Sequence, residues 1–121
     1  MAQSYKDLVA WQKTTELVLS IYELTEKFPK QEIYGLTSQL RRAAVSVPSN
    51  IAEGQARYSK REFIHFLRNS MGSLAEIETQ LVICERLKYI QAAQLAKSGK
   101  QCAEIGRIVN GLINSMQPEG A

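Results

Sequence analysis

Apolar residues recur every three or four positions along almost the whole chain, in four segments separated by short breaks. In residues 6–28 two adjacent stripes have this spacing: Leu8, Trp11, Val18 and Tyr22 in one, and Ala10, Leu17, Ile21, Leu24 and Phe28 in the other. Such spacing places side chains on one face of an α-helix. Two adjacent stripes give this helix a wide apolar face, so we expect it to touch two neighbouring helices.

Three further segments have the same periodicity and predict helices over about 33–53, 60–88 and 91–116. The third follows Ser59, which stands three residues before Glu62 in a capping-box pattern. The expected core positions are Leu36, Leu40, Ala44, Val47 and Ile51; Phe63, Leu67, Ser70, Leu74, Ile77, Leu81 and Cys84; and Leu95, Cys102, Ile105, Val109, Leu112 and Met116. Short connections between long amphipathic helices imply antiparallel neighbours. The sequence therefore predicts one all-α domain over 1–121, an up-down antiparallel four-helix bundle, with a frayed C-terminal QPEGA.

Pro48 lies inside the second predicted helix, where a proline removes a backbone donor and clashes with an earlier carbonyl, at a cost of about 3 kcal/mol. The apolar stripe nevertheless keeps its phase across the proline, and a new helix would have no reason to continue the phase of the old one. The pattern predicts a single helix with a proline kink, ending near Gly54. The donors expected to serve the carbonyl of Ala44, which loses its usual partner, are Ser46, Ser49 or Asn50.

Composition narrows the class of protein. The 121 residues include only three prolines and seven glycines, which favours helices over a many-turned β architecture. The chain lacks an N-terminal apolar segment after a basic start and any run of about 20 apolar residues, so we expect a cytoplasmic protein without a membrane span. Cys84 and Cys102 are expected to be free core residues and not a disulfide or metal ligands.

Residues that carry out catalysis are scarce. His65 is the single histidine, Asp7 is the single aspartate, and no glycine-rich phosphate loop is present. Glu62 and His65 form an E-x-x-H pattern of the kind used in di-iron bundles, but only a symmetric dimer would supply the second histidine. The alternative is that Glu62 caps a helix and His65 lies at the surface or at an interface. We expect no catalytic residue, no metal and no cofactor.

Positive charge gathers at the start of the third predicted helix. Arg57, Lys60 and Arg61 stand around its first residue, and Arg68 follows two turns later. Because a helix N-terminus carries partial positive charge and free amides, added cations create a place for an anion such as phosphate. Tyr58 offers a stacking surface if the anion belongs to single-stranded nucleic acid. A solvated helix end without a ligand has the same pattern.

A polar row follows one side of the second predicted helix and consists of Gln39, Arg42, Ser46, Asn50 and Glu53. Their spacing of three and four places them beside the apolar stripe. The row predicts a structural hydrogen-bonded network between helices in preference to a ligand site. Small apolar residues on the outer side of the same helix indicate contact with another subunit: Val45, Ala52 and Ala56.

The chain resembles the small four-helix-bundle proteins encoded in 23S rRNA intervening sequences. The matching stretches are YKDLVAWQK, FPKQEIYGLTSQLRRAAVSVPSNIAEGQAR, FIHFLRNSMGSLAEIETQL and the last predicted helix, together about residues 5–116. The resemblance implies a four-helix bundle that often assembles as a homopentamer and has no assigned biochemical activity. It also implies a relationship to the accessory protein of diversity-generating retroelements, a cationic helical barrel that associates with reverse transcriptase and nucleic acid.

The resemblance also marks individual positions, none of them catalytic: Trp11, Arg41, Arg42, Pro48, Asn50, Glu53 and Gly54. Lys88 departs from the family pattern, because members commonly have glycine before this turn. The departure puts a left-handed end of the third helix in doubt.

We therefore expect a non-enzymatic, oligomeric bundle that binds the phosphates of RNA or DNA. The expected contacts, without base-specific recognition, are Arg41, Arg57, Lys60, Arg61 and Arg68. A charge of +3 per subunit favours an acidic partner, and assembly multiplies that charge. The alternative is a protein-interaction scaffold, in which the outer face of the second helix binds another copy and then a protein partner.

Overall fold

The computed structural model describes residues 4–117, and these residues fold into helices joined by short connections. The long helices are α1 (Val9–Thr25), α2 (Leu36–Ala56), α3 (Lys60–Arg86) and α4 (Ala92–Met116), with short 3₁₀ helices η1 (Tyr5–Asp7) and η2 (Lys30–Glu32) before α1 and α2. The described residues contain no strand, so the predicted all-α fold with four helices is confirmed. Of the QPEGA tail that was expected to fray, residues 118–121 lie outside the described part.

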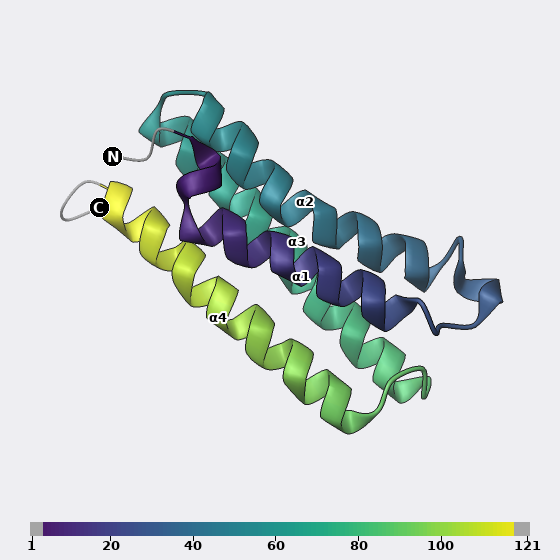
Figure 1. Cartoon of the computed structure of the whole chain (residues 1–121). Helices are drawn as coiled ribbons and strands as arrows, with labels where there is room; N and C mark the ends of the chain where they lie inside the picture. Colours follow the sequence, from purple (N-terminus) through teal and green to yellow (C-terminus); the bar gives the residue numbers. More distant parts are fainter. Residues whose placement is uncertain (1–3, 118–121) are drawn as a thin grey trace.

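The four helices pack side by side, and each contacts two others (Figure 1). Helix α1 lies against α2 and α4, and α3 lies against the same two helices, so the backbones of the diagonal pairs stay apart. The two neighbours expected for the first helix are therefore present. The largest fully buried side chains lie at predicted core positions and include Leu17, Ile21, Leu40, Val47, Ile51, Leu67, Ile77, Leu81, Ile105 and Val109.

Helix boundaries differ from the predicted ones mainly around the first connection. The second helix begins at Leu36 and not at 33, because 30–32 form the separate 3₁₀ turn η2. A carboxylate oxygen of Glu32 accepts a hydrogen bond from the Leu36 amide at 3.1 Å, and the other accepts one from the Tyr89 hydroxyl at 2.7 Å. Glu32 thus caps α2 and ties its start to the connection between α3 and α4.

Helix α2 continues through Pro48, as the unbroken apolar phase predicts, and Pro48 itself is buried. The prediction about its neighbours is wrong in detail. The hydroxyls of Ser46 and Ser49 and the amide of Asn50 donate to the carbonyls of Ala43, Val45 and Ser46, at 2.8 Å each. Within residues 4–117 no side chain donates to Ala44. Each short polar side chain bonds the carbonyl three or four residues before it, which is the nearest one on its own side of the helix.

Gly54 lies inside α2 and does not end it, because the helix continues to Ala56. A β-carbon at Gly54 would come within 2.8 Å of the Phe66 β-carbon and within 2.9 Å of the Phe63 ring. The glycine is therefore required for the close approach of α2 and α3, and the sequence-based interpretation of it as a stop signal is wrong.

Helix α3 does end in a left-handed residue, although that residue is lysine. Lys88 has φ 67°, and the amides of Lys88 and Tyr89 donate to the carbonyls of Glu85 and Cys84, both at 2.9 Å. This is the Schellman arrangement that usually contains glycine. Backbone hydrogen bonds therefore hold the geometry that the sequence put in doubt. Cys84 and Cys102 are free and buried.

Candidate nucleic-acid interface

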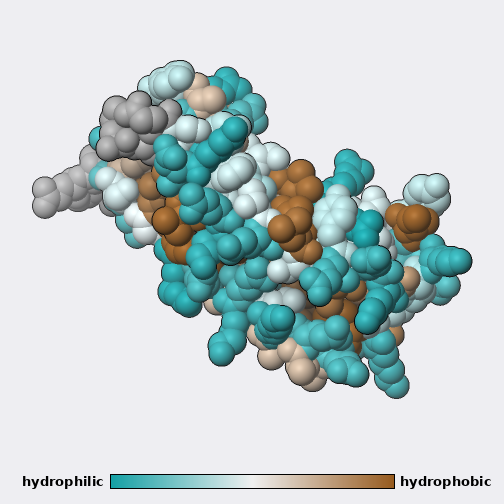
Figure 2. Space-filling view, viewed as in Figure 1, coloured by the Kyte–Doolittle hydropathy of each residue, from teal (hydrophilic) through white to brown (hydrophobic). Residues whose placement is uncertain are grey.

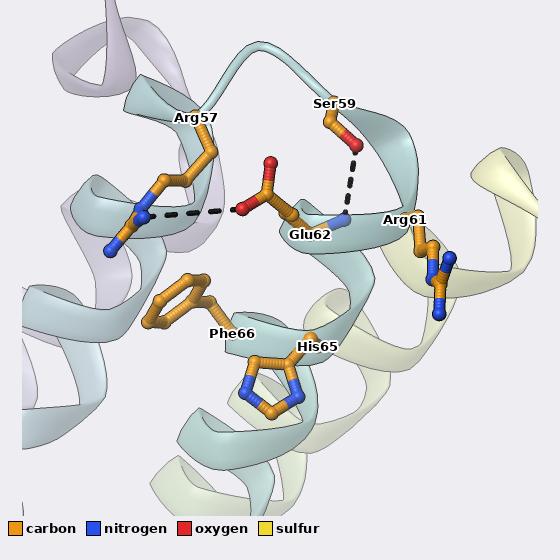
Figure 3. A pocket seen from close by; sticks show the side chains of 6 residues that line it. All are labelled: Arg57, Ser59, Arg61, Glu62, His65 and Phe66. Carbon is orange, nitrogen blue, oxygen red and sulfur yellow. Dashed lines mark hydrogen bonds and ion pairs between the residues drawn. The ribbon is translucent and has the colours of Figure 1, made fainter.

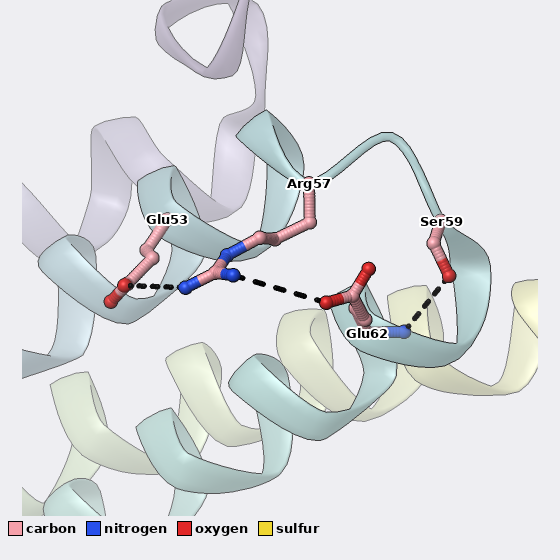
Figure 4. Close-up of polar contacts among 4 residues, drawn as sticks. All are labelled: Glu53, Arg57, Ser59 and Glu62. Atoms are coloured by element: carbon pink, nitrogen blue, oxygen red, sulfur yellow. Dashed lines mark hydrogen bonds and ion pairs between the residues drawn. The ribbon is translucent and has the colours of Figure 1, made fainter.

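The corner between α2 and α3 is a tight connection with a capped helix start. The chain turns through Tyr58 in the left-handed region, at φ 57°, and Ser59 becomes the N-cap of α3. The Ser59 hydroxyl accepts a hydrogen bond from the Glu62 amide at 3.3 Å. Only this half of the predicted capping box forms, because the Glu62 carboxylate points to Arg57 instead (Figure 4).

Arg57 is the organising cation of this corner. Its guanidinium lies 3.2 Å from the Glu53 carboxylate and 3.9 Å from that of Glu62, so it links the end of α2 to the start of α3. The same group lies over the Phe66 ring, 5.2 Å from the ring centroid. The two carboxylates compensate its positive charge, and the ring holds its orientation.

A hollow of about 630 Å³ opens beside this ion-pair group (Figure 3). Its lining residues are Arg57, Ser59, Arg61, Glu62, His65 and Phe66. The His65 and Phe66 rings meet edge to face, 5.3 Å apart at 78°. The hollow therefore combines guanidinium groups, which bind phosphate, with aromatic rings, which stack on bases.

Three of the five predicted phosphate contacts gather around the start of α3. Lys60, Arg61 and Arg68 are exposed, and none of them forms an ion pair with a side chain of residues 4–117. Arg57 belongs to the same corner, but its charge is compensated there. The unpaired positive charge of this corner is thus carried by Lys60, Arg61 and Arg68.

Arg41, the fifth predicted contact, lies elsewhere. It stands about 24 Å from Arg57 along the axis of α2, at about 1.5 Å per residue. Its Nε donates to the Thr25 hydroxyl at 2.9 Å, and its guanidinium lies over the Tyr22 ring, 4.5 Å from the centroid. Arg41 therefore joins α2 to the end of α1 and does not belong to the corner cluster.

The polar row of α2 makes separate contacts and not one network. The Ser46 hydroxyl bonds that of Ser73, and the Gln39 side chain accepts from Gln80 at 3.3 Å, so these two positions connect α2 to α3. Asn50 bonds within its own helix, Glu53 pairs with Arg57, and Arg42 is exposed without an ion pair in the described part of the chain. Beside them lies a second hollow, of about 420 Å³, lined by Gln39, Arg42, Ala43, Ser46 and Glu76.

Phe66 was not among the predicted site residues, and the predicted stacking surface was Tyr58. Tyr58 is 95% exposed and does not line the hollow. Phe66 lies one turn after Glu62, so helical spacing from the charged cluster was the available signal. For metals, no group of three potential ligands occurs within residues 4–117. None of the described helices has the length and apolarity needed to cross a membrane.

The fold and this corner together define a small four-helix bundle with a cationic, aromatic-lined hollow between two of its helices. Residues 6–111 match the sequence model of the family described as 23S rRNA-intervening sequence protein, and the chain belongs to that family. The resemblance seen in the sequence is confirmed to that extent.

A solved structure supports the same fold. The chain is similar to a protein of unknown function from the S23 ribosomal protein family of Bacteroides thetaiotaomicron, with a TM-score of 0.77 and 24% sequence identity. The similarity covers 87% of this chain and 98% of the other. Comparison with curated proteins finds no match.

Proposed function

We propose that this protein is a non-enzymatic nucleic-acid-binding bundle that holds RNA or DNA phosphates at the corner of α2 and α3. The observation that carries the proposal is a group of three exposed cations in the first turns of α3, Lys60, Arg61 and Arg68, of which Arg61 lines the mixed aromatic and basic hollow. The partial positive charge of the start of α3 adds to the charges of Lys60 and Arg61 in its first turn, and both favour the binding of an anion there. A phosphate chain would meet this positive charge at several points.

Arg57 has a positioning role in this proposal. Because Glu53 and Glu62 compensate it, its contribution is to fix the Phe66 ring and the end of α2. Glu62 also brings a carboxylate into the hollow, which repels phosphate. Glu62→Gln is therefore expected to strengthen binding.

We further propose that the protein acts as a cytoplasmic homo-oligomer, with the pentamer implied by the family resemblance as the first candidate. Surface features support self-association: apolar patches interrupt the hydrophilic face in Figure 2, and Leu19 is 70% exposed. Gly72, Gly99 and Gly111 lie within helices, and a β-carbon at any of them would meet nothing within 4 Å. A helical glycine costs about 1 kcal/mol of helix stability relative to alanine. Close packing of another copy against these glycines would explain why the chain has them at these helical positions. Light scattering measures the assembly state.

The architecture we propose for this assembly is an up-down antiparallel bundle whose second helix bends at Pro48. Support for a bend comes from Ala44, whose carbonyl has no helical donor at position 48 and no side-chain donor within residues 4–117. The same bend would orient the outer face of α2, where Val45 is 42% exposed. The relationship to the accessory protein of diversity-generating retroelements also stays a proposal.

The test is binding of labelled RNA and DNA across a salt series, with a triple variant Lys60→Gln, Arg61→Gln and Arg68→Gln. Each lost phosphate contact is expected to reduce the slope of log affinity against log salt by about 0.9 for duplex DNA and about 0.7 for single strands. The matched control is Lys97→Gln, Lys100→Gln and Arg107→Gln on α4, which removes the same charge from exposed positions.

Equal losses in the two triple variants, or binding that does not respond to salt, would contradict a specific role for the corner. A protein that binds no nucleic acid, but retains one stoichiometric protein partner after nuclease treatment, would instead support the scaffold function. The exposed Val45 on the outer face of α2 is the observation that favours this second candidate.

A further inference from the structure

One side of the start of α3 has an aromatic residue between two arginines in helical order. Arg61, His65 and Arg68 follow each other at spacings of four and three residues, and all three are exposed. They therefore share one side of the helix, with the ring about 6 Å beyond Arg61 and about 4.5 Å before Arg68 along the axis. A nucleotide within a strand has the complementary pattern, one base with a phosphate on each side.

The His65 ring has an aromatic neighbour before any ligand arrives. It meets the Phe66 ring edge to face, the Arg57 guanidinium lies over the Phe66 ring, and Gly54 lies close to the Phe66 β-carbon. His65 is exposed, and its ring forms no hydrogen bond with residues 4–117. An ordered ring loses little conformational freedom when a ligand stacks on it.

We propose that the hollow accepts one unpaired nucleobase of a single-stranded nucleic acid, stacked on His65, while Arg61 and Arg68 hold the phosphates on either side. This inference rests on the proposed function and adds the class of nucleic acid. The hollow of about 630 Å³ contains the aromatic rings, and a base reaches them only when it is out of a duplex. Stacking requires no particular base, because every base has a π face.

The relative affinity for single-stranded and double-stranded nucleic acid distinguishes base stacking from simple charge attraction. A surface that only neutralises phosphates favours the duplex, since double-stranded DNA has the higher charge density and the steeper salt dependence. A surface that stacks an unpaired base favours the single strand. The two expectations have opposite signs.

The experiment measures the affinity of the full chain for a labelled single strand, for the same sequence in a duplex, and for an abasic strand with the same number of phosphates. We expect the tightest binding to the single strand. His65→Ala should lower that affinity by about fivefold to a hundredfold, the range that base stacking contributes, and should leave duplex affinity unchanged. His65→Phe keeps the ring and should retain single-strand binding. Tyr34→Ala, at an aromatic residue that is 94% exposed and outside the hollow, is the matched control.

Equal affinity for single strand and duplex overturns the inference, as does an abasic strand that binds as well as the intact one. Equal effects of His65→Ala and Tyr34→Ala overturn it as well. These outcomes differ from failure of the proposed function, which appears as salt-insensitive binding, or as no effect of the triple variant at Lys60, Arg61 and Arg68. Circular dichroism of each variant checks that the bundle is intact.

Discussion

Replacing Lys88 by glycine is expected to stabilise the protein. The residue has φ 67°, where a side chain with a β-carbon costs about 1–2 kcal/mol. Glycine removes this strain but increases the freedom of the unfolded chain, which costs about 0.5–1 kcal/mol. The Lys88 side chain is exposed and forms no ion pair within residues 4–117, so nothing else is lost. At the centres of these two ranges the net gain is about 0.75 kcal/mol.

Thermal unfolding followed by circular dichroism measures this gain. With an unfolding entropy of about 2.1 cal/mol/K per residue over 121 residues, 1 kcal/mol corresponds to about 4 °C. We therefore expect Tm to rise by about 2–4 °C in Lys88→Gly. The matched control is Lys100→Gly, which removes the same exposed side chain inside α4 and should lower stability by about 0.5–1 kcal/mol. A Tm that falls or stays constant in Lys88→Gly would refute the strain argument.

Three further predictions concern other parts of the bundle. Arg41→Lys should lower the free energy of unfolding in a urea titration by about 1 kcal/mol, because lysine cannot both stack on the Tyr22 ring and donate to the Thr25 hydroxyl. Nucleic-acid affinity should stay constant. A selective loss of affinity would place Arg41 in the interface. Hydrogen bonds from the Tyr89 hydroxyl and a backbone amide lower the pKa of Glu32 below its usual 4.5. The ionised carboxylate therefore stabilises the folded protein above that pH, and this stabilisation is lost in stronger acid. Tyr89→Phe should therefore lower the urea midpoint near neutral pH and have little effect in strong acid; an equal loss at both would contradict the linkage. Burial raises the pKa of the Cys84 thiol to about 11 and that of Cys102 to about 12. Thiol reagents should therefore label the folded protein only at the rate at which the bundle unfolds locally or globally. Rapid labelling at mildly alkaline pH would refute this.

The periodic pattern of apolar residues was sufficient to predict the four helices and their buried faces. Leu40, Val47 and Ile51 are buried where a three-and-four spacing places them, and the same spacing correctly carried α2 through Pro48. Periodicity works for such positions because burial repeats with each turn. It contains no information about the ends of helices, where a single side chain such as Glu32 decides which residue comes first.

The candidate site could be predicted only in part, because charge is visible in a sequence and pairing is not. Arg57 has Glu53 four residues before it, a spacing that favours an ion pair, but its second partner, Glu62, lies on α3, and Arg61 forms no ion pair within residues 4–117. The role of Gly54 was also hidden, since a glycine near a helix end resembles a stop signal until the neighbouring helix is in place. The contacts of Arg57 with Glu62 and of Gly54 with α3 depend on the distance between helices, which no local pattern records.

The contact at Gly54 means that the shape of the hollow and its charge can be changed independently of each other. The residue has no side chain, yet it determines how near the Phe66 β-carbon and the Phe63 ring stand to α2. Exposed charges of the first turns of α3, such as Lys60 and Arg68, can be exchanged without changing this contact. A β-carbon at position 54 would instead push α2 and α3 apart, because it would come within 2.9 Å of Phe63 and Phe66. The shape of the hollow is thus a property of the bundle interior, whereas its attraction for a ligand is adjustable from the surface.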